Sequence, residues 1–149
     1  MPGLVLEGGT FRPIFSAGVM DALLDEDIMF LYVIGVSAGI TNGTSYISKQ
    51  KGRNLQILLH HRNDPRYIGP GNIPKEKSIF GRDFVFNEIP NKLYPFDWET
   101  YRSYQGRIRV GVTNAQTGLP EYFDGHKLDR RGKMLQASCA LPLMFPAIQ

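Results

Sequence analysis

The chain has a single cysteine, Cys139, and it contains no long hydrophobic run. One cysteine excludes an internal disulfide and is typical of a reducing compartment. Cys139 lies in the apolar stretch ASCALPL, which favours a packed thiol over a nucleophile. No segment approaches the roughly 18 consecutive apolar residues of a transmembrane helix, and no basic leader precedes an apolar segment at the N-terminus. We therefore expect a cytoplasmic protein without a transmembrane segment, at most peripheral to a membrane.

The chain also has little excess of one charge sign over the other. The chain carries 17 Lys and Arg against 14 Asp and Glu, a formal net charge of +3. This mild balance does not predict nucleic-acid binding. The densest basic segment, residues 127–133 (KLDRRGK), is interrupted by Asp129. We interpret it as a solvated helix start, with weak attraction to phosphate or anionic lipid as the alternative.

Internal repeats and metal-ligand spacings are absent as well. No cluster of histidines, cysteines or carboxylates has the spacing of a metal site, so we expect no metal and no cofactor. The 149 residues are 42% hydrophobic, enough for the core of one domain spanning residues 1–149.

Apolar runs and helical spacing alternate in the first third of the chain. Residues 4–7 and 32–36 have the composition of buried strands. Residues 13–26 between them have helical spacing, with a predicted apolar stripe through Phe15, Val19 and Leu23 that Ile14, Met20 and Leu24 widen. A helix over residues 38–51 follows the second strand. This order predicts a βαβ unit with parallel strands and a right-handed crossover.

The pattern changes in the rest of the chain. A short helix is predicted over residues 55–61, and prolines then break up residues 63–104, which we interpret as an irregular surface segment or a substrate-facing lid. Residues 107–113 alternate as a strand, and residues 121–123 return as its partner. A last helix is predicted over residues 129–141, before Pro142. The fold class is therefore α/β with a mainly parallel sheet.

The stretch YVIGVSAG carries the strongest chemical signal. A buried strand leads directly into Gly35-x-Ser37-x-Gly39 and then into a helix. This is the context of a nucleophile elbow, in which a sharp turn exposes the serine and small neighbours allow strand and helix to pass closely. The helix N-terminus at Ser37 also favours developing negative charge. The alternative is a glycine-serine turn whose hydroxyl caps the helix.

The first predicted strand, residues 4–7, also runs into a glycine turn. This turn is Gly8-Gly9, within the segment LVLEGGTFR. Turns after parallel strands open at the same edge of the sheet, where ligands bind. The amides of Gly9, Thr10 and Phe11 are therefore predicted to form an oxyanion hole facing Ser37, with Ala38 as a further donor. Arg12 would fix this loop or add positive charge. A dinucleotide-binding turn is not expected, because Thr10 and Pro13 stand where its second and third glycines belong.

Together these loops resemble the patatin-like phospholipase family, the lipid acyl hydrolases that use a Ser–Asp dyad. The resemblance covers LVLEGG to Arg12, YVIGVSAG and the later ASCALPLMFPAI. It implies a three-layer α/β/α sandwich in which Ser37 is the nucleophile. It also aligns Gly8, Gly9, Thr10 and Arg12 with the oxyanion loop. The sequence departs from the family at Thr10 and Pro13, where glycine is usual, so a loop of different shape is expected if position 10 has positive φ.

No residue of the chain stands out as the base for Ser37. His60 and His61 are adjacent, so they point apart on a helix. A Ser37–Asp124–His126 triad would require a carboxylate and an imidazole two residues apart to pair, and we do not expect it. In the family the dyad aspartate follows the segment that ASCALPLMFPAI resembles. We therefore expect the base in an Asp-Gly-Gly or Asp-Gly-Ala motif beyond Gln149, with residues 1–149 the inactive N-terminal portion of a longer domain.

The expected function is a serine acyl-ester hydrolase of the phospholipase A or lysophospholipase type, acting on an acyl lipid or ester. One alternative is a non-catalytic domain of the same fold that binds lipid or a protein partner, which the departures at Thr10 and Pro13 favour. Another is an acyltransferase, since the choice between water and another acceptor is not written in these motifs.

Overall fold

A four-stranded sheet forms one side of the molecule in the computed structural model, which describes residues 2–142 and 144–149. Its order is β1-β2-β3-β4, with β1 (Leu4–Leu6), β2 (Tyr32–Val36) and β3 (Arg107–Thr113) parallel and β4 (Pro120–Asp124) antiparallel to β3. The α/β class and the mainly parallel sheet are confirmed. So is the pairing of the first two strands, which are in register at Leu6 and Gly35.

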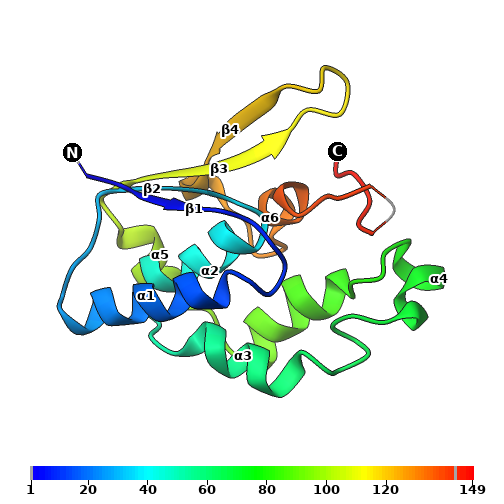
Figure 1. Ribbon diagram of the computed structural model, residues 1–149, viewed down its shortest axis with the longest axis horizontal. Helices are drawn as coiled ribbons and strands as arrows, with labels where there is room; N and C mark the ends of the chain where they lie inside the picture. The colour runs from blue at the N-terminus through cyan, green and yellow to red at the C-terminus, as the bar shows by residue number, and fades with distance from the viewer. Residues whose placement is uncertain (1, 143) are drawn as a thin grey trace.

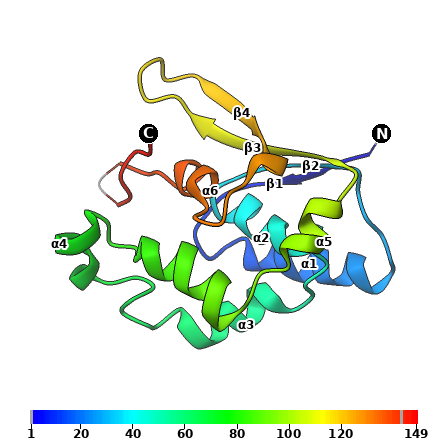
Figure 2. The same ribbon diagram turned by 180° about the vertical axis from the view of Figure 1, so that it is seen from behind.

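The helices lie on one face of this sheet (Figures 1 and 2). They are α1 (Ile14–Asp25), α2 (Ser37–Ile47), α3 (Arg53–His61), η1 (Pro70–Asn72), α4 (Ile73–Glu76), the π-helix η2 (Phe84–Leu93), α5 (Trp98–Ser103), η3 (Gly125–Lys127) and α6 (Lys133–Ser138). Residues 2–142 and 144–149 thus form two layers, the sheet and one layer of helices, and not the three layers expected; Val5 on the open face of the sheet is 78% exposed. Across the part of the chain that the structure describes, no helix is long and apolar enough to cross a membrane.

The core lies between the sheet and α1, α2 and α6. Its fully buried side chains include Val33 and Ile108 from the strands and Met20 and Ile40 from the helices. Ser45 and Ser48 are also buried there, and each is satisfied by hydrogen bonds. Burial of these apolar side chains is what fixes α2 against the sheet, and with it the position of its first residue.

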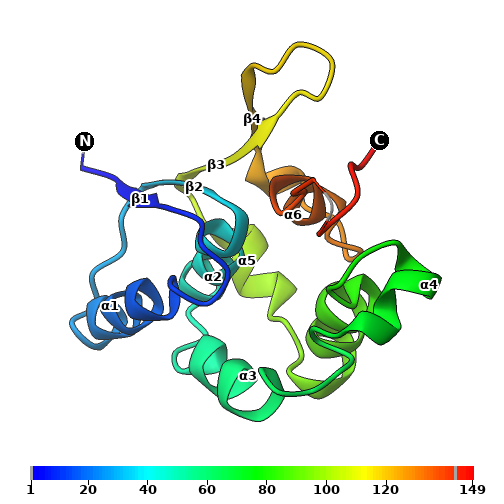
Figure 3. The same ribbon diagram turned by 45° about the vertical axis from the view of Figure 1, so that its right-hand side comes forward.

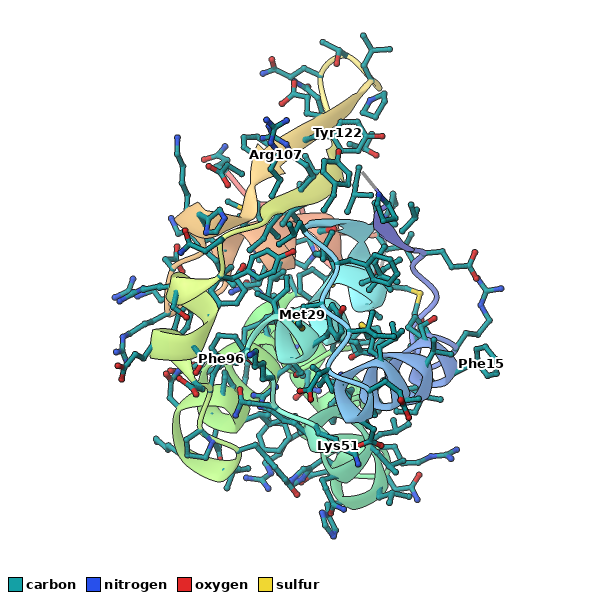
Figure 4. All side chains as sticks on the ribbon, turned by 90° about the vertical axis from the view of Figure 1, so that its left-hand side faces the viewer. Phe15, Met29, Lys51, Phe96, Arg107 and Tyr122 are labelled. Carbon is teal, nitrogen blue, oxygen red and sulfur yellow. The ribbon has the colours of Figure 1, made fainter. Side chains whose placement is uncertain are left out.

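The predicted apolar stripe on α1 is only partly correct. Met20 is buried as expected, and Ile14, Leu23 and Leu24 pack against the core. Phe15, however, is 79% exposed and points away from the molecule (Figure 4), and Val19 is 44% exposed. Ala17 faces the core in their place. Apolar residues surround most of this helix, so two overlapping stripes fit its sequence, and the small Ala17 permits closer packing than Phe15 would.

Residues 63–104 are more regular than expected. They contain α4, α5 and η2, in which Phe84, Phe86 and Ile89 are buried although Pro90 lies inside the helix. The wider π-helical turn tolerates a residue without an amide hydrogen. The last helix is shorter than the predicted 129–141, because Gly132 adopts φ +63° and only residues 133–138 are helical.

Candidate active site

The two glycine turns meet at the carboxyl edge of the sheet. A Cβ built on Gly8 would lie 3.0 Å from the Cβ of Ser37 and 3.6 Å from its Oγ. Any side chain at position 8 would therefore cover the hydroxyl. The predicted juxtaposition of the Gly8-Gly9 turn with Ser37 is present in the structure.

The glycines that flank Ser37 are required by the close approach of α2 to β1. A Cβ on Gly39 would lie only 2.2 Å from the carbonyl oxygen of Glu7, and one on Gly35 would lie 2.8 Å from that of Leu6. Backbone atoms cannot move aside as a flexible side chain can. The Gly-x-Ser-x-Gly pattern is thus a packing requirement of this strand-to-helix turn.

Ser37 itself has a strained backbone. It is the first residue of α2 and has φ +53°, in the left-handed region that disfavours residues with a Cβ. Its carbonyl oxygen accepts a hydrogen bond from Thr41 Oγ1 at 3.0 Å. Its Oγ lies 3.8 Å from the Sγ of Cys139. The half-buried hydroxyl is therefore at the surface of a cavity and is loosely held.

A hydroxyl from a distant part of the chain holds the amide of Ser37. The Ser37 N–H donates to Ser138 Oγ at 2.7 Å, and Ser138 Oγ donates to the carbonyl oxygen of Gly111 at 2.7 Å. Ser138 is the last residue of α6, which lies beside α2 and against β3 (Figure 3). Sequence reasoning missed this residue, although it lies in the ASCALPL stretch.

Position 10 of the Gly8-Gly9 loop has positive φ although it is threonine. Gly9 has φ +135° and Thr10 has φ +53°, so a β-branched residue occupies a left-handed conformation. The amides of Gly9, Thr10 and Phe11 donate no hydrogen bond within residues 2–142 and 144–149. Three unsatisfied donors are thus available beside Ser37.

Arg12 holds the outside of this loop. Its guanidinium lies over Gly9, where a Cβ would approach Nε to 2.6 Å, and it donates to the carbonyl oxygen of Gly8 at 3.4 Å. It also pairs with Glu7 at 3.7 Å, with both side chains largely exposed. Of the two roles considered for Arg12, the geometry matches fixing the loop.

A cavity of about 560 Å³ opens at Ser37. Its size lies in the usual range for small-molecule sites. The loop residues Gly9, Thr10 and Phe11 line it together with Ser37 and Ala38. Much of the remaining wall is apolar and comes from Val36, Phe80, Val85, Phe86, Leu141, Met144 and Phe145.

A second, inner cavity of about 110 Å³ adjoins the first. The two share the lining residues Thr10, Phe11, Thr41, Asn42, Tyr67, Val85 and Phe86. The inner cavity extends between α2, α3 and η2 and is lined mainly by aliphatic and aromatic side chains such as Ile57, Ile89 and Phe96. Apolar space thus continues inward from Ser37.

Burial raises the pKa of two titratable side chains at the cavity, Cys139 and Tyr67. Burial raises the pKa of the Cys139 thiol, although its contacts with Ser37 and Thr41 act in the opposite direction. Burial also raises the pKa of Tyr67 to about 12. Neither group is a base at neutral pH, and the described wall of the Ser37 cavity contains no carboxylate and no imidazole.

The histidines and Asp124 are engaged elsewhere. His126 Nε2 lies 2.8 Å from the carbonyl oxygen of Gly106, and Asp124 caps η3 by accepting from the His126 amide. His60 contacts the Tyr94 hydroxyl. His61 lies 3.7 Å from Asp64, whose pKa is lowered to about 2 by hydrogen bonds from Arg66. The structure does not bring Asp124 or His126 into hydrogen-bond contact with Ser37.

No group of three or more His, Cys, Asp or Glu side chains among the described residues has the arrangement of a metal site. The Ser37 cavity brings together a serine hydroxyl, the residues of the Gly9–Phe11 loop and a largely apolar wall. That arrangement is suited to attack on an ester carbonyl.

Comparison with known proteins identifies the family. The chain is 26% identical over 98 residues to the Escherichia coli (strain K12) protein YjjU, described as uncharacterized, and the match covers 65% of this chain and 27% of that protein. The chain therefore spans about a quarter of the length of this relative. The sequence profile of the family described as "Patatin-like phospholipase" matches residues 4–149. The chain belongs to the patatin-like phospholipase family, the lipid acyl hydrolases that its two glycine turns predicted.

Proposed function

We propose that this domain, within the whole protein, is a serine acyl-ester hydrolase of the phospholipase A or lysophospholipase type with Ser37 as the nucleophile. The observation that carries the proposal is the strained strand-to-helix turn at Ser37, whose hydroxyl faces Gly8 and opens onto a cavity. Ser37 Oγ attacks the ester carbonyl carbon and transfers its proton to a base. The alcohol then leaves with a proton, and water hydrolyses the acyl-enzyme.

The oxyanion of the tetrahedral intermediate is assigned to the backbone amides of Gly9, Thr10 and Phe11, with Ala38 as a further donor. The three loop amides have no partner in the described part of the chain, and all four residues line the Ser37 cavity. Ala38 lies in the first turn of α2, where helical amides lack an intrahelical acceptor. Preorganised donors of this kind stabilise charge that develops in the transition state.

The substrate is assigned as an acyl lipid, at a membrane surface or free as a monomer. Supporting this choice, the wall beyond Ser37 is largely apolar and continues into the inner cavity. An acyl chain gains free energy from contact with such a surface.

The base is assigned to a carboxylate outside residues 1–149, in the dyad motif Asp-Gly-Gly or Asp-Gly-Ala. Ser37 Oγ has no carboxylate or imidazole partner within residues 2–142 and 144–149. A serine hydroxyl at its ordinary pKa is a weak nucleophile until a base removes its proton.

A fluorophosphonate probe applied to the full-length protein tests the proposal. We expect covalent labelling in the wild type, with the modified peptide containing Ser37, and no labelling in Ser37→Ala. Labelling at another serine would contradict the assignment. Release of the acyl group to an alcohol in preference to water would indicate an acyltransferase.

A non-catalytic lipid- or partner-binding domain is the second candidate. The left-handed Thr10 and the cavity wall without a carboxylate or imidazole favour it. This candidate predicts that the wild-type full-length protein is not labelled by the probe, although it still binds a fatty-acid ligand.

Replacing Gly9 by alanine in the full-length protein is expected to reduce turnover by about 10²-fold or more, the scale of losing one oxyanion donor. Gly9 has φ +135°, a conformation that strains any residue with a Cβ, so the loop is expected to shift; the exposed Arg12 guanidinium that the Cβ would meet can move aside. Gly18→Ala is the matched control, since a Cβ at position 18 meets no atom within 4 Å. Hydrolysis of a short-chain nitrophenyl ester measures both, and equal rates would show that another loop supplies the donors.

A further inference from the structure

The strained conformation of Ser37 is held by few contacts. Its backbone has φ +53°, and its hydroxyl makes only a 3.8 Å contact with Cys139 Sγ. Thr41 binds its carbonyl oxygen, but Thr41 belongs to the same helix and moves with it. Among the residues that the structure describes, the one hydrogen bond that ties the Ser37 backbone to another helix or strand is the 2.7 Å bond from its amide to Ser138 Oγ.

Ser138 is itself anchored to the sheet. Its hydroxyl donates to the carbonyl oxygen of Gly111 in β3 at 2.7 Å while it accepts from Ser37. The single hydroxyl hydrogen is used on Gly111, so a lone pair is left for the Ser37 amide and the direction of the bond is fixed. The bridge Gly111–Ser138–Ser37 therefore joins β3, α6 and the turn between β2 and α2.

This bridge also prevents the Ser37 amide from serving as an oxyanion donor. An N–H that donates to Ser138 is not free to donate to the oxyanion of an ester attacked by the same residue. The donors for the oxyanion are then left to the loop amides and Ala38. A shift of the turn would move Oγ relative to those donors, and misplacement by about 1 Å is enough to cost roughly 10²-fold in rate.

We infer that Ser138 is a positioning residue: its hydroxyl, bound to Gly111, holds the Ser37 amide and so fixes the nucleophile in its strained conformation. The inference rests on the proposed function, because it assigns Ser138 a role in the reactivity of Ser37. The side chain also lines the Ser37 cavity, but in this role it acts through the Ser37 amide.

Ser138→Ala in the full-length protein removes the bridge. Ser103→Ala is the matched control, since Ser103 is the last residue of α5 as Ser138 is of α6, and its hydroxyl binds the Thr100 carbonyl far from the site. Ser138→Thr keeps the hydroxyl and serves as the rescue variant. Three quantities are measured: the second-order rate of fluorophosphonate labelling at Ser37, the hydrogen exchange rate of the Ser37 amide and the thermal midpoint.

We expect labelling of Ser138→Ala to slow by about 10- to 100-fold, and exchange of the Ser37 amide to quicken by at least tenfold. We expect Ser103→Ala to match the wild type and Ser138→Thr to recover most of the rate. A folded Ser138→Ala protein that is labelled at the wild-type rate would overturn the inference, and so would unchanged exchange at Ser37. If Ser138→Ala does not fold, Ser138→Cys takes its place, and its weaker hydrogen bond should give an intermediate rate. A wild-type rate there would likewise overturn the inference.

The two proposals fail differently. A wild-type protein that is not labelled at Ser37 contradicts the proposed function. A wild-type protein that is labelled, together with an equally reactive Ser138→Ala, contradicts only the role of Ser138.

Discussion

Replacing Ser37 by alanine in the full-length protein is expected to lower ester hydrolysis by about 10⁴- to 10⁶-fold, the scale of losing the nucleophile in serine hydrolases. The acyl-enzyme is assigned to this hydroxyl, and burial raises the pKa of the neighbouring Cys139 thiol, which disfavours the thiolate as the nucleophile. In the variant, water would have to attack the ester directly, with help from the oxyanion donors but without an acyl-enzyme. Initial rates with a short-chain nitrophenyl ester measure the loss.

The Ser37→Ala protein should keep its fold. Alanine removes only Oγ, and its smaller side chain fits the same turn, so the thermal midpoint should remain near that of the wild type. Ser103→Ala again serves as the control and should retain full activity. Hydrolysis by Ser37→Ala within tenfold of the wild type would show that Ser37 is not the nucleophile and would favour the binding-domain candidate.

Local sequence patterns were sufficient to predict the part of the fold that carries the site. The strands at 4–6, 32–36 and 107–113 have β-branched or alternating residues, and their parallel order follows from the helix between the first two. The Gly-x-Ser-x-Gly turn could be recognised because each glycine is required by a close backbone contact. A Cβ at either position would collide with a carbonyl oxygen at the end of β1. The family resemblance rested on these same residues.

The buried face of α1 and the helices of residues 63–104 depend on tertiary packing and could not be predicted from local patterns. On α1 two apolar faces compete, and contact with the neighbouring α2 selects Ala17 and Met20 over Phe15. Residues 63–104 have no continuous periodicity because their helices are short, and one of them, η2, has π-helical spacing. No pattern of period 3.6 or 2 describes such a segment.

The Ser138 bridge lay beyond local reasoning for a different reason. Ser138 and Ser37 are 101 residues apart in the chain, and their hydrogen bond depends on how α6 packs between α2 and β3. A serine in an apolar stretch was the available signal, because a half-buried hydroxyl needs a partner. The sequence alone did not identify which backbone group that partner is.

Ser37 needs a base, because a serine hydroxyl without one should be nearly inert. The His126 ring contacts the Gly106 carbonyl oxygen, and Asp124 accepts from the His126 amide. His60 contacts the Tyr94 hydroxyl, and His61 lies beside Asp64. None of these groups lines the described wall of the Ser37 cavity. Any of these four side chains would have to leave its present contact to reach Ser37.

Residues 1–149 expressed alone are therefore expected to hydrolyse a short-chain nitrophenyl ester about 10²- to 10⁴-fold more slowly than the full-length protein, the usual contribution of a general base. Circular dichroism establishes whether the fragment is folded. If it is not, Asp→Asn in the predicted Asp-Gly-Gly or Asp-Gly-Ala motif of the full-length protein makes the same test. Asp124→Asn and His126→Gln in the full-length protein are the controls and should leave turnover unchanged. Comparable activity in a folded fragment would place the base within residues 1–149, and a collapse of activity in either control would identify it.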